Sequence, residues 1–323
     1  MINIGSIGSG TIVKNMLSTM KKVDGYELIG FYSRDINKAN EFKKEFEIKY
    51  AYDDLEEMLS NDEINTIYIA SPNSLHYEQA KKALLNEKNV ICEKPFTSRV
   101  SEAEELISIA RKNKLNIFEA ISNVYLPLLN RVKKEIENIG KISSVIVNFS
   151  QYSSKYDRYL KGDIANVFRS EFSGGALADL GIYNLHLIYH LFGNPKDLNY
   201  FGNINEYGVD MSGVASFKYD DFVVNFTCAK DTFSKNFIDI QGDKGYIFID
   251  NTLQAAKKMV IYKDGSKEEI VISDNRMYEY ELEYFRNNFD NVDGLIKDNE
   301  NSIEVLKIFE KLKKSGNIRD SIS

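Results

Sequence analysis

Short apolar runs alternate with amphipathic stretches through the first third of this chain. The apolar runs lie at 2–7, 28–32, 64–70, 89–92 and 116–119, and the helical patterns lie near 11–22, 36–46, 54–60, 75–87 and 100–113. Strands that alternate with helices at this spacing predict βαβ units and a parallel sheet. Because crossovers between parallel strands are right-handed, we expect helices on both faces of a doubly wound sheet.

The pattern changes near residue 122, without a flexible spacer. The elements expected beyond it are helices at 124–138, 174–191, 277–290 and 301–315, and a strand at 142–151. Between 197 and 272 turns recur at a spacing of about 8 to 12 residues, which predicts an antiparallel sheet. Asp220-Asp221 and Asp264-Gly265 suit hairpin turns in that sheet. We therefore expect two domains, 1–122 and 123–323.

Composition limits the partners of this chain. Its 323 residues are 43% hydrophobic and 28% charged, which suits a globular protein with two cores. A net charge of -7 gives no general attraction to nucleic acid or anionic lipid, and no apolar stretch reaches the length of about 18 residues that spans a membrane. Cys92 lies in an apolar run, so we expect its thiol to be buried and reduced. With a strand at the N-terminus in place of a charged leader, we expect a cytoplasmic protein that binds neither nucleic acid nor membranes.

A glycine-rich turn, Gly5–Gly10, follows the first apolar run and opens a helix. Gly8 and Gly10 match a dinucleotide fingerprint, with Val13 where that fingerprint has Gly or Ala. Glycines let backbone N–H groups approach a pyrophosphate, and the helix N-terminus supplies partial positive charge. A tight strand-to-helix turn is the alternative, but the position within a βαβ unit favours a cofactor. The expected cofactor contacts are Gly5, Ile7, Gly8, Ser9, Gly10, Thr11 and Ile12.

The second apolar run ends in Ser33, Arg34 and Asp35. Folds that prefer NAD place an acid here for the ribose 2′-hydroxyl, whereas Ser33 and Arg34 suit a 2′-phosphate. Arg34 over the adenine ring, or Asp35 on the ribose, would also allow NAD. We expect NADP in preference to NAD.

Two further turns end apolar runs. Ser71-Pro72-Asn73 precedes a helical pattern, where Asn73 suits an N-cap or a position that lines the nicotinamide end of the cleft. His76 is expected either to contact the cofactor or to serve the structure alone. The other turn, Glu93-Lys94-Pro95, ends a buried run, and ligands bind at the carboxyl ends of parallel strands. Lys94 can reach both a cofactor and a substrate there, and Glu93 is also expected near the cofactor.

The stretch 174–191 holds a second set of polar residues. Asp179 and Tyr183 are four apart and share one helix face, with His186 close to it, so they can form an acid–base cluster. Alternatively, Asp179 interacts with the helix dipole and Tyr183 is a core aromatic residue. His186 and His190 have the spacing of metal ligands, but no nearby Cys or Glu completes a set, and we expect no metal.

Together these motifs resemble the glucose-fructose oxidoreductase, inositol dehydrogenase and rhizopine catabolism family, called Gfo/Idh/MocA. The motifs that carry the resemblance are the glycine-rich N-terminus, Ser71-Pro72-Asn73 with His76, Glu93-Lys94-Pro95, and Gly174-Gly175-Ala176-Leu177 with Asp179, Gly181 and Tyr183. The resemblance implies a Rossmann domain followed by an α/β domain with a large, mostly antiparallel open sheet. That sheet commonly forms the oligomer interface in the family, so a homodimer or homotetramer is expected.

The resemblance also implies roles for residues. Lys94 matches the active-site lysine and Asp179 the substrate-binding acid. Many members have histidine at the position of Tyr183. Tyrosine there resembles the branch of glucose-fructose oxidoreductase and dimeric dihydrodiol dehydrogenase. Arg34 matches the members that use NADP.

The expected reaction is hydride transfer between nicotinamide and a carbinol or carbonyl carbon of a sugar, polyol or cyclic diol. Tyr183 is expected to exchange the hydroxyl proton as a general acid and base. The ordinary pKa of a tyrosine phenol is about 10, and the resemblance implies that the Lys94 ammonium favours the phenolate of Tyr183. Asp179 orients a substrate hydroxyl, and Arg169, with Tyr156 or Arg158, reaches the same small polyhydroxylated substrate. Two alternatives stay open: a cofactor-binding regulator without turnover, and a cofactor-assisted hydrolase or lyase of the same fold.

Overall fold

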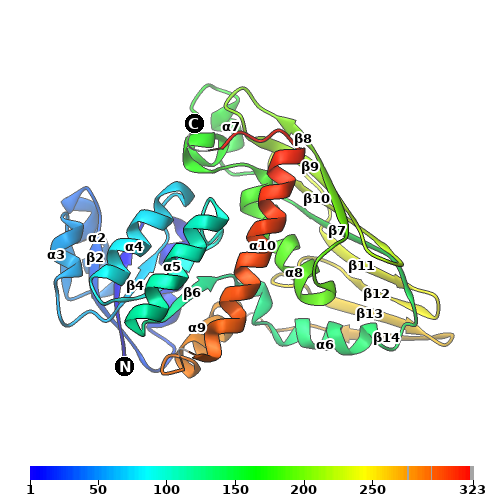
Figure 1. Ribbon diagram of the computed structural model, residues 1–323, viewed down its shortest axis with the longest axis horizontal. Helices are drawn as coiled ribbons and strands as arrows, with labels where there is room; N and C mark the ends of the chain where they lie inside the picture. Colours follow the sequence, from blue (N-terminus) through cyan, green and yellow to red (C-terminus); the bar gives the residue numbers. More distant parts are fainter. Residues whose placement is uncertain (275, 292, 321–323) are drawn as a thin grey trace. The chain divides into compact units, whose positions relative to one another are not determined.

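The computed structural model describes residues 1–274, 276–291 and 293–320, which divide into two compact units (Figure 1). Unit 1 comprises Met1–Ile121 together with Tyr278–Leu306. Unit 2 comprises Ser122–Met277 and the chain from Lys307 onward. Within the described residues, no helix is both long and apolar enough to cross a membrane.

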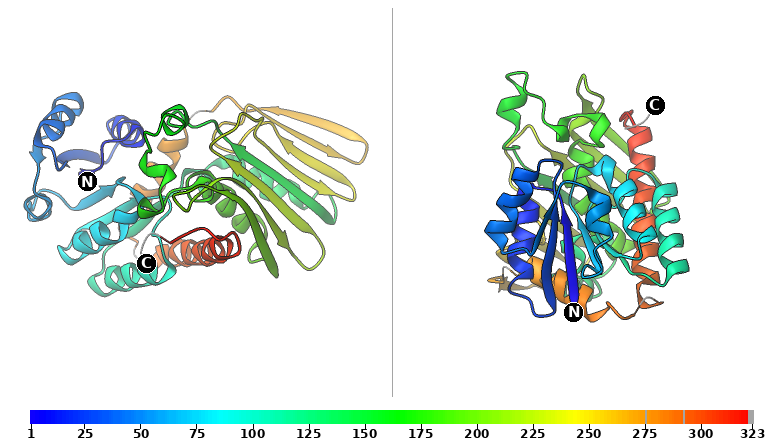
Figure 2. Two further views of the ribbon diagram at one scale, coloured as in Figure 1. Left: turned by 90° about the horizontal axis from the view of Figure 1, so that it is seen from above. Right: turned by 90° about the vertical axis from the view of Figure 1, so that its left-hand side faces the viewer.

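Unit 1 contains six parallel strands in the order β3-β2-β1-β4-β5-β6. The strands are β1 (Ile2–Ile7), β2 (Tyr26–Tyr32), β3 (Tyr50–Tyr52), β4 (Thr66–Ile69), β5 (Asn89–Glu93) and β6 (Ile117–Ala120). The helices between them are α1 (Thr11–Met20), α2 (Ile36–Phe46), α3 (Leu55–Leu59), α4 (His76–Leu85) and α5 (Val100–Asn113), and they lie on both sides of the sheet (Figure 2). The order reverses between β1 and β4, which is where a doubly wound sheet binds ligands.

Apolar periodicity explains why these elements form. Helix α1 buries Val13, Met16, Leu17 and Met20, which recur at three- and four-residue steps along one face. Helix α2 packs Phe42 against Phe31 of β2, with ring centroids 4.3 Å apart. Each helix therefore covers the sheet with its apolar face and turns its charged residues outward.

The chain returns to unit 1 near its C-terminus, through α9 (Met277–Asn287) and the first part of α10 (Ile296–Ser315). Phe285 of α9 packs on Phe118 of β6, with centroids 4.7 Å apart. Tyr26 donates to the carbonyl of Leu282 over 2.7 Å. This return segment completes the core beside β6 with residues far away in sequence.

Unit 2 is built on eight strands in the order β14-β13-β12-β11-β7-β10-β9-β8. The strands are β7 (Ile142–Ser150), β8 (Asp197–Ile204), β9 (Asp210–Lys218), β10 (Val223–Ala229), β11 (Phe237–Gly242), β12 (Gly245–Ile249), β13 (Lys258–Lys263) and β14 (Ser266–Val271). All neighbouring strands are antiparallel except β7 and β10. The expected fold class is confirmed, including the hairpin turns at Asp220-Asp221 and Asp264-Gly265.

The two faces of this sheet differ. Helices α6 (Pro127–Ile136) and α8 (Ile182–Phe192) pack on one face, over buried side chains such as Val145 and Phe226. Residues that alternate with these point the other way. Ile146, Phe201 and Val214 are 38%, 68% and 40% exposed on that second face. Unit 2 thus has one covered face and one open, partly apolar face.

Candidate active site

The glycine-rich turn of unit 1 has the geometry of a phosphate cradle. Gly8 has φ 109°, and a Cβ on it would lie 2.3 Å from the carbonyl oxygen of Ala70. Gly10 is the N-cap of α1, and no atom lies within 4 Å of the position that its Cβ would take. The first turn of α1 contains no acidic residue, so the positive end of the helix is not neutralised locally. Backbone N–H groups of this turn and Thr11 fit a diphosphate.

The other residues of this turn that are expected to contact the cofactor differ in how far they are buried. Ile7 is buried at the end of β1, and Ser9 is exposed. Ile12 is half-buried in the first turn of α1. Gly5 lies in β1, where a Cβ would come within 2.9 Å of Ile67 Cδ1, so a larger residue here would displace the Ile67 side chain.

The end of β2 presents a hydroxyl and a guanidinium group. Ser33 is half-buried and Arg34 is exposed. The Asp35 carboxylate is the N-cap of α2 and accepts a hydrogen bond from the Asn37 N–H over 2.9 Å. Because Asp35 caps the helix, Ser33 and Arg34 are the groups that fit a ribose 2′-phosphate, as NADP requires.

The turn after β4 corrects one expectation. Asn73 does not cap α4: it begins a short 3-10 turn, Asn73–Leu75, and the N-cap of α4 is Leu75. A single turn of tighter helix thus separates Ser71-Pro72 from α4, and Asn73 is the first residue of that turn. Ser71 donates from its hydroxyl to Gln79 over 2.7 Å.

His76 joins this turn to the one that carries Lys94. Its Nδ1 lies 3.0 Å from the carbonyl oxygen of Pro95, and its Nε2 lies 3.0 Å from that of Ser71. Burial lowers the pKa of His76 and favours the neutral ring, which has one N–H and donates to one carbonyl at a time. His76 therefore has a structural role in holding two adjacent turns together.

Lys94 follows β5 directly and is half-buried. The Lys94–Pro95 peptide bond is cis. Glu93 accepts a hydrogen bond from Tyr68 over 2.9 Å, and the Phe96 N–H donates to Glu119 over 3.1 Å. With His76 on Pro95, the residues on both sides of Lys94 are fixed by buried partners.

Three carboxyl groups interact beside this turn, and the apolar pattern alone did not reveal them as a group. Glu93, Glu119 and Glu281 are 7%, 5% and 1% exposed. Burial raises the pKa of Glu93, against the lowering effect of the Lys94 ammonium. Burial and the charges of Glu93 and Glu119 raise the pKa of Glu281. Glu119 ends an apolar run and Glu281 lies on the return segment, so only the fold brings them together.

In unit 2, a glycine turn leads into the helix that carries Asp179 and Tyr183. Gly175 has φ 110°, and a Cβ there would lie 2.2 Å from Asp210 Oδ1. The expected helix at 174–191 begins as a π-helical turn, Leu177–Gly181, and continues as α8. Such turns occur at functional sites more often than elsewhere. Asp179 lies in the π turn and Tyr183 in the first turn of α8.

Tyr183 is fixed through both its backbone and its ring. Its carbonyl accepts a hydrogen bond from the Asn123 side chain over 2.8 Å, and its ring lies 5.8 Å from that of Phe149. His186 is buried, and its carbonyl oxygen lies 2.8 Å from His190 Nδ1. Across the described residues, no three His, Cys, Asp or Glu side chains are arranged to hold a metal ion.

Lys230 is a further candidate residue, which the sequence motifs did not indicate. It follows β10, its side chain is 7% exposed, and its ammonium forms an ion pair with Asp179 Oδ2. The two residues are 51 positions apart, and no spacing pattern joins them. Arg169, also in unit 2, donates to the Ile164 carbonyl, and its guanidinium carbon lies 5.1 Å from the centroid of the Tyr207 ring.

The segment around α7 (Tyr156–Tyr159) contains Tyr156 and Arg158, the two other residues expected to reach the substrate. Tyr156 stacks on Tyr159, with centroids 5.7 Å apart. Arg158 is exposed and forms an ion pair with Asp163 over 2.6 Å. The candidate residues thus form two groups: Lys94 and the residues expected to bind the cofactor in unit 1, and Asp179, Tyr183 and Arg169 in unit 2.

Comparisons with known proteins show which family this chain resembles. Residues 2–120 match a family model described as an oxidoreductase family with an NAD-binding Rossmann fold, and residues 130–248 match the GFO/IDH/MocA C-terminal domain. A scyllo-inositol 2-dehydrogenase (NADP(+)), IolU of Bacillus subtilis, is 35% identical over 97% of each chain. A trans-1,2-dihydrobenzene-1,2-diol dehydrogenase of Sus scrofa is 28% identical over 75% of this chain and 72% of its own.

A solved structure shows the same fold. KijD10, a 3-ketoreductase from Actinomadura kijaniata in complex with NADP and TDP-benzene, superposes with a TM-score of 0.87 at 20% identity, over 99% of this chain and 98% of its own. The chain therefore belongs to the Gfo/Idh/MocA family of oxidoreductases, whose N-terminal domain is an NAD-binding Rossmann fold.

Proposed function

We propose that this protein is an NADP-preferring dehydrogenase or reductase that acts on a CH–OH group of a polyol, sugar or cyclic diol. The observation that carries the proposal is the turn at Lys94, which is held by Glu93, His76 and Glu119 at the sheet edge where the glycine cradle lies. The names of the two curated relatives, an inositol dehydrogenase and a dihydrodiol dehydrogenase, support the class of substrate.

In the proposed mechanism, the turn at Gly8 and Gly10 would hold the nicotinamide cofactor, which would supply the hydride chemistry. The phenol oxygen of Tyr183 takes the hydroxyl proton in oxidation and returns it in reduction. The Lys94 ammonium polarises the substrate oxygen. Asp179 accepts a hydrogen bond from a neighbouring substrate hydroxyl. Because the protein orients the reactants and the cofactor carries the redox chemistry, loss of one side chain lowers turnover without removing the cofactor.

Substitution of the two reacting residues tests the assignment. We expect Lys94→Met and Tyr183→Phe each to lower kcat by about 10²- to 10⁴-fold, the usual contribution of a positioned acid or base. NADPH formation from scyllo-inositol, other inositols, aldoses and trans-dihydrodiols is the assay, and NADPH fluorescence measures cofactor binding. Lys112→Met, at an exposed lysine, and Tyr189→Phe, on the same helix as Tyr183, are the controls. Turnover close to wild type in both active-site variants would exclude this mechanism.

The preference for NADP is proposed to depend on Arg34. We expect Arg34→Ala to raise KM for NADP⁺ by about 10- to 100-fold, since a charge-assisted contact to phosphate is lost. KM for NAD⁺ should change little, because NAD⁺ has no 2′-phosphate. Initial rates with both cofactors give the two values. Equal effects on both cofactors would show that Arg34 acts through the adenine ring instead.

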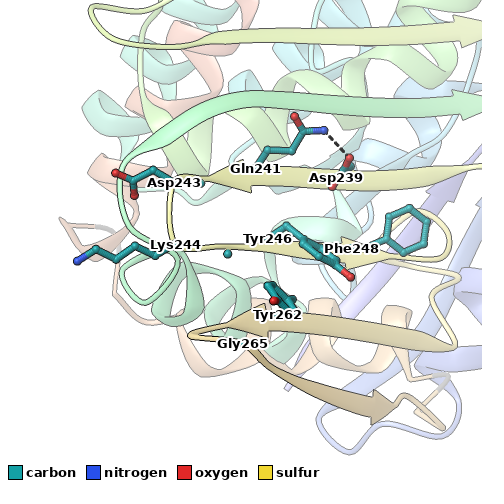
Figure 3. A pocket seen from close by; sticks show the side chains of 10 residues that line it. Asp239, Gln241, Asp243, Lys244, Tyr246, Phe248, Tyr262 and Gly265 are labelled. Carbon is teal, nitrogen blue, oxygen red and sulfur yellow. Dashed lines mark hydrogen bonds between the residues drawn. The ribbon is translucent and has the colours of Figure 1, made fainter.

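The open face of the sheet in unit 2 is the proposed surface for a homodimer or homotetramer. A shallow hollow of about 770 Å³ on this face is lined by residues of β11, β12 and β13 (Figure 3). Tyr246 and Tyr262 stack there, with centroids 5.4 Å apart, beside Phe248. Aromatic side chains on a large exposed surface are typical of interfaces.

Roles for the domains and a compartment complete the proposal. We assign cofactor binding to residues 1–122, and substrate binding and oligomerisation to residues 123–323. Cys92 and Cys228 are free, buried thiols, which supports a reducing compartment such as the cytoplasm.

A further inference from the structure

Lys230 is a buried lysine with one partner in the candidate site. Its side chain is 7% exposed, against 35% for Asp179, to which it is ion-paired. Burial of an ammonium group is costly unless a carboxylate accompanies it. The pair therefore cannot be separated without leaving a charge in a poorly solvated position.

The backbone of Lys230 is fixed on both sides. Its N–H donates to the carbonyl of Met211 over 2.8 Å, and its carbonyl accepts from the Ser153 N–H over 2.9 Å. These bonds continue the pairing of β10 with β9 and with the chain beyond β7. The sheet thus sets the point from which the lysine side chain extends.

A second carboxylate interacts with the same ammonium group. Asp210 is fully buried, and its Oδ2 accepts hydrogen bonds from Tyr200 over 2.5 Å and from the Leu177 N–H over 2.7 Å. Burial raises the pKa of Asp210, and the charge of Lys230 opposes this. Leu177 begins the π turn that carries Asp179, so Asp210 holds the backbone of this turn while Lys230 holds its carboxylate.

We propose that Lys230 is a positioning residue, which holds the Asp179 carboxylate in one orientation to accept a hydrogen bond from a substrate hydroxyl. The inference rests on the proposed function and adds to it a second residue through which Asp179 acts. Lys230 itself does not touch the reacting carbon. Substrates with a hydroxyl beside the reacting carbinol are therefore the ones that depend on Lys230.

A double-mutant cycle tests this role. NADPH formation from the inositol, aldose and dihydrodiol panel is measured for wild type, Lys230→Met, Asp179→Asn and the double variant of the full chain. We expect Lys230→Met to lower kcat/KM by about 10- to 100-fold, mainly through KM, with NADPH affinity unchanged. Adding Lys230→Met to Asp179→Asn should cause no further loss, because the lysine acts through the aspartate. Lys230→Arg, which keeps the charge, should recover most of the activity.

Two controls separate the possible failures. Lys235→Met, at an exposed lysine in the same loop, should behave as wild type. If Lys230→Met loses the native circular dichroism spectrum, Lys230→Gln replaces it and faces the same criteria. Losses that add in the double variant, or wild-type kcat/KM in Lys230→Met or its replacement Lys230→Gln, would overturn the inference while leaving the proposed function intact. A wild-type chain without turnover on the whole panel would instead reject the proposed function, and this inference with it.

Discussion

The Lys94 turn is supported by carboxyl groups that are costly to ionise. No described residue donates a hydrogen bond to Glu281 Oε1, and this side chain is 1% exposed. Glu93 and Tyr278 lie near enough to interact electrostatically with Glu281. A carboxyl group in such surroundings is stable mainly in its neutral form. In its neutral form, Glu281 therefore adds no further negative charge beside the turn that carries Lys94.

Glu281 should make stability depend on pH. A carboxyl group with a raised pKa in the folded state binds more protons there than in the unfolded chain. The free energy of unfolding therefore falls as pH rises from the unfolded pKa, about 4.3, toward the folded pKa. We expect Glu281→Gln to remove this contribution, about 1.4 kcal/mol for each pKa unit of the shift, so that stability declines less between pH 5 and pH 8. Urea unfolding at several pH values measures it.

The control for this prediction is Glu300→Gln, at an exposed glutamate of α10. Its free energy of unfolding should follow the wild-type dependence on pH. Glu93 keeps its own raised pKa in both variants, so some decline should persist. Parallel curves for wild type and Glu281→Gln would mean that Glu281 has the same proton affinity in both states.

Part of the structure around these residues could be predicted from the local sequence. The apolar run before Lys94 correctly predicted a strand that ends at Glu93. The contacts of Lys230 with Asp179 and of Ser302 with Glu119 join residues 51 and 183 positions apart. Such pairs leave no periodicity in the sequence, because only tertiary packing brings them together.

Among the elements, the π turn at Leu177–Gly181 depends on a glycine. Gly175 precedes the turn with φ 110°, in the region where residues with a Cβ are strained. The carboxylate of Asp210 fills the space that a Cβ would need and accepts a hydrogen bond from Leu177. The turn, its glycine and its buried acceptor therefore form one local structure.

Gly175→Ala should disturb this structure in two ways. Positive φ is unfavourable for alanine, and the added methyl group would displace Asp210 from Leu177. We expect the free energy of unfolding to fall by about 2 to 4 kcal/mol, the sum of backbone strain and a lost buried hydrogen bond. Urea unfolding gives the value. KM for the substrate should rise as Asp179 moves, while NADPH affinity stays unchanged.

Gly162→Ala separates the two causes. Gly162 also has positive φ, 82°, but no atom lies within 4 Å of the position of its Cβ. This variant should show the strain alone, about 1 kcal/mol. If the two variants lost equal stability, the contact with Asp210 would contribute nothing.

Several elements could not be predicted from local patterns. Strand β3 has three residues and forms because it pairs with β2. Helix α10 begins at Ile296, five residues before the expected start at 301, in a polar stretch without a helical apolar pattern. The π turn replaces an expected α-helical start, and the Asp210 carboxylate that accepts from the Leu177 N–H lies 33 residues away in sequence. In contrast, the segments with a long apolar periodicity were correctly predicted as helices or strands.

For the whole molecule, the open face of unit 2 is the surface through which we propose that copies of the chain associate. Ile146 lies on the central strand β7, between Asn225 of β10 and Asp239 of β11. Val214 lies opposite Phe201 in the pairing of β9 with β8. These side chains expose apolar surface on the face that no helix of unit 2 covers. A second copy of the same face would bury this surface in a symmetric interface.

Charge introduced on this face should separate the copies. We expect wild type to elute at a mass of at least twice 37.0 kDa, and Ile146→Lys with Val214→Lys to shift it toward 37.0 kDa, because an unpaired ammonium group is costly to bury. Size-exclusion chromatography with light scattering measures the mass. Leu85→Lys, at an exposed leucine that ends α4 in unit 1, is the matched control and should leave the mass unchanged. An oligomer that survives both lysines, or dissociates with Leu85→Lys alone, would place the interface outside the open face of the sheet.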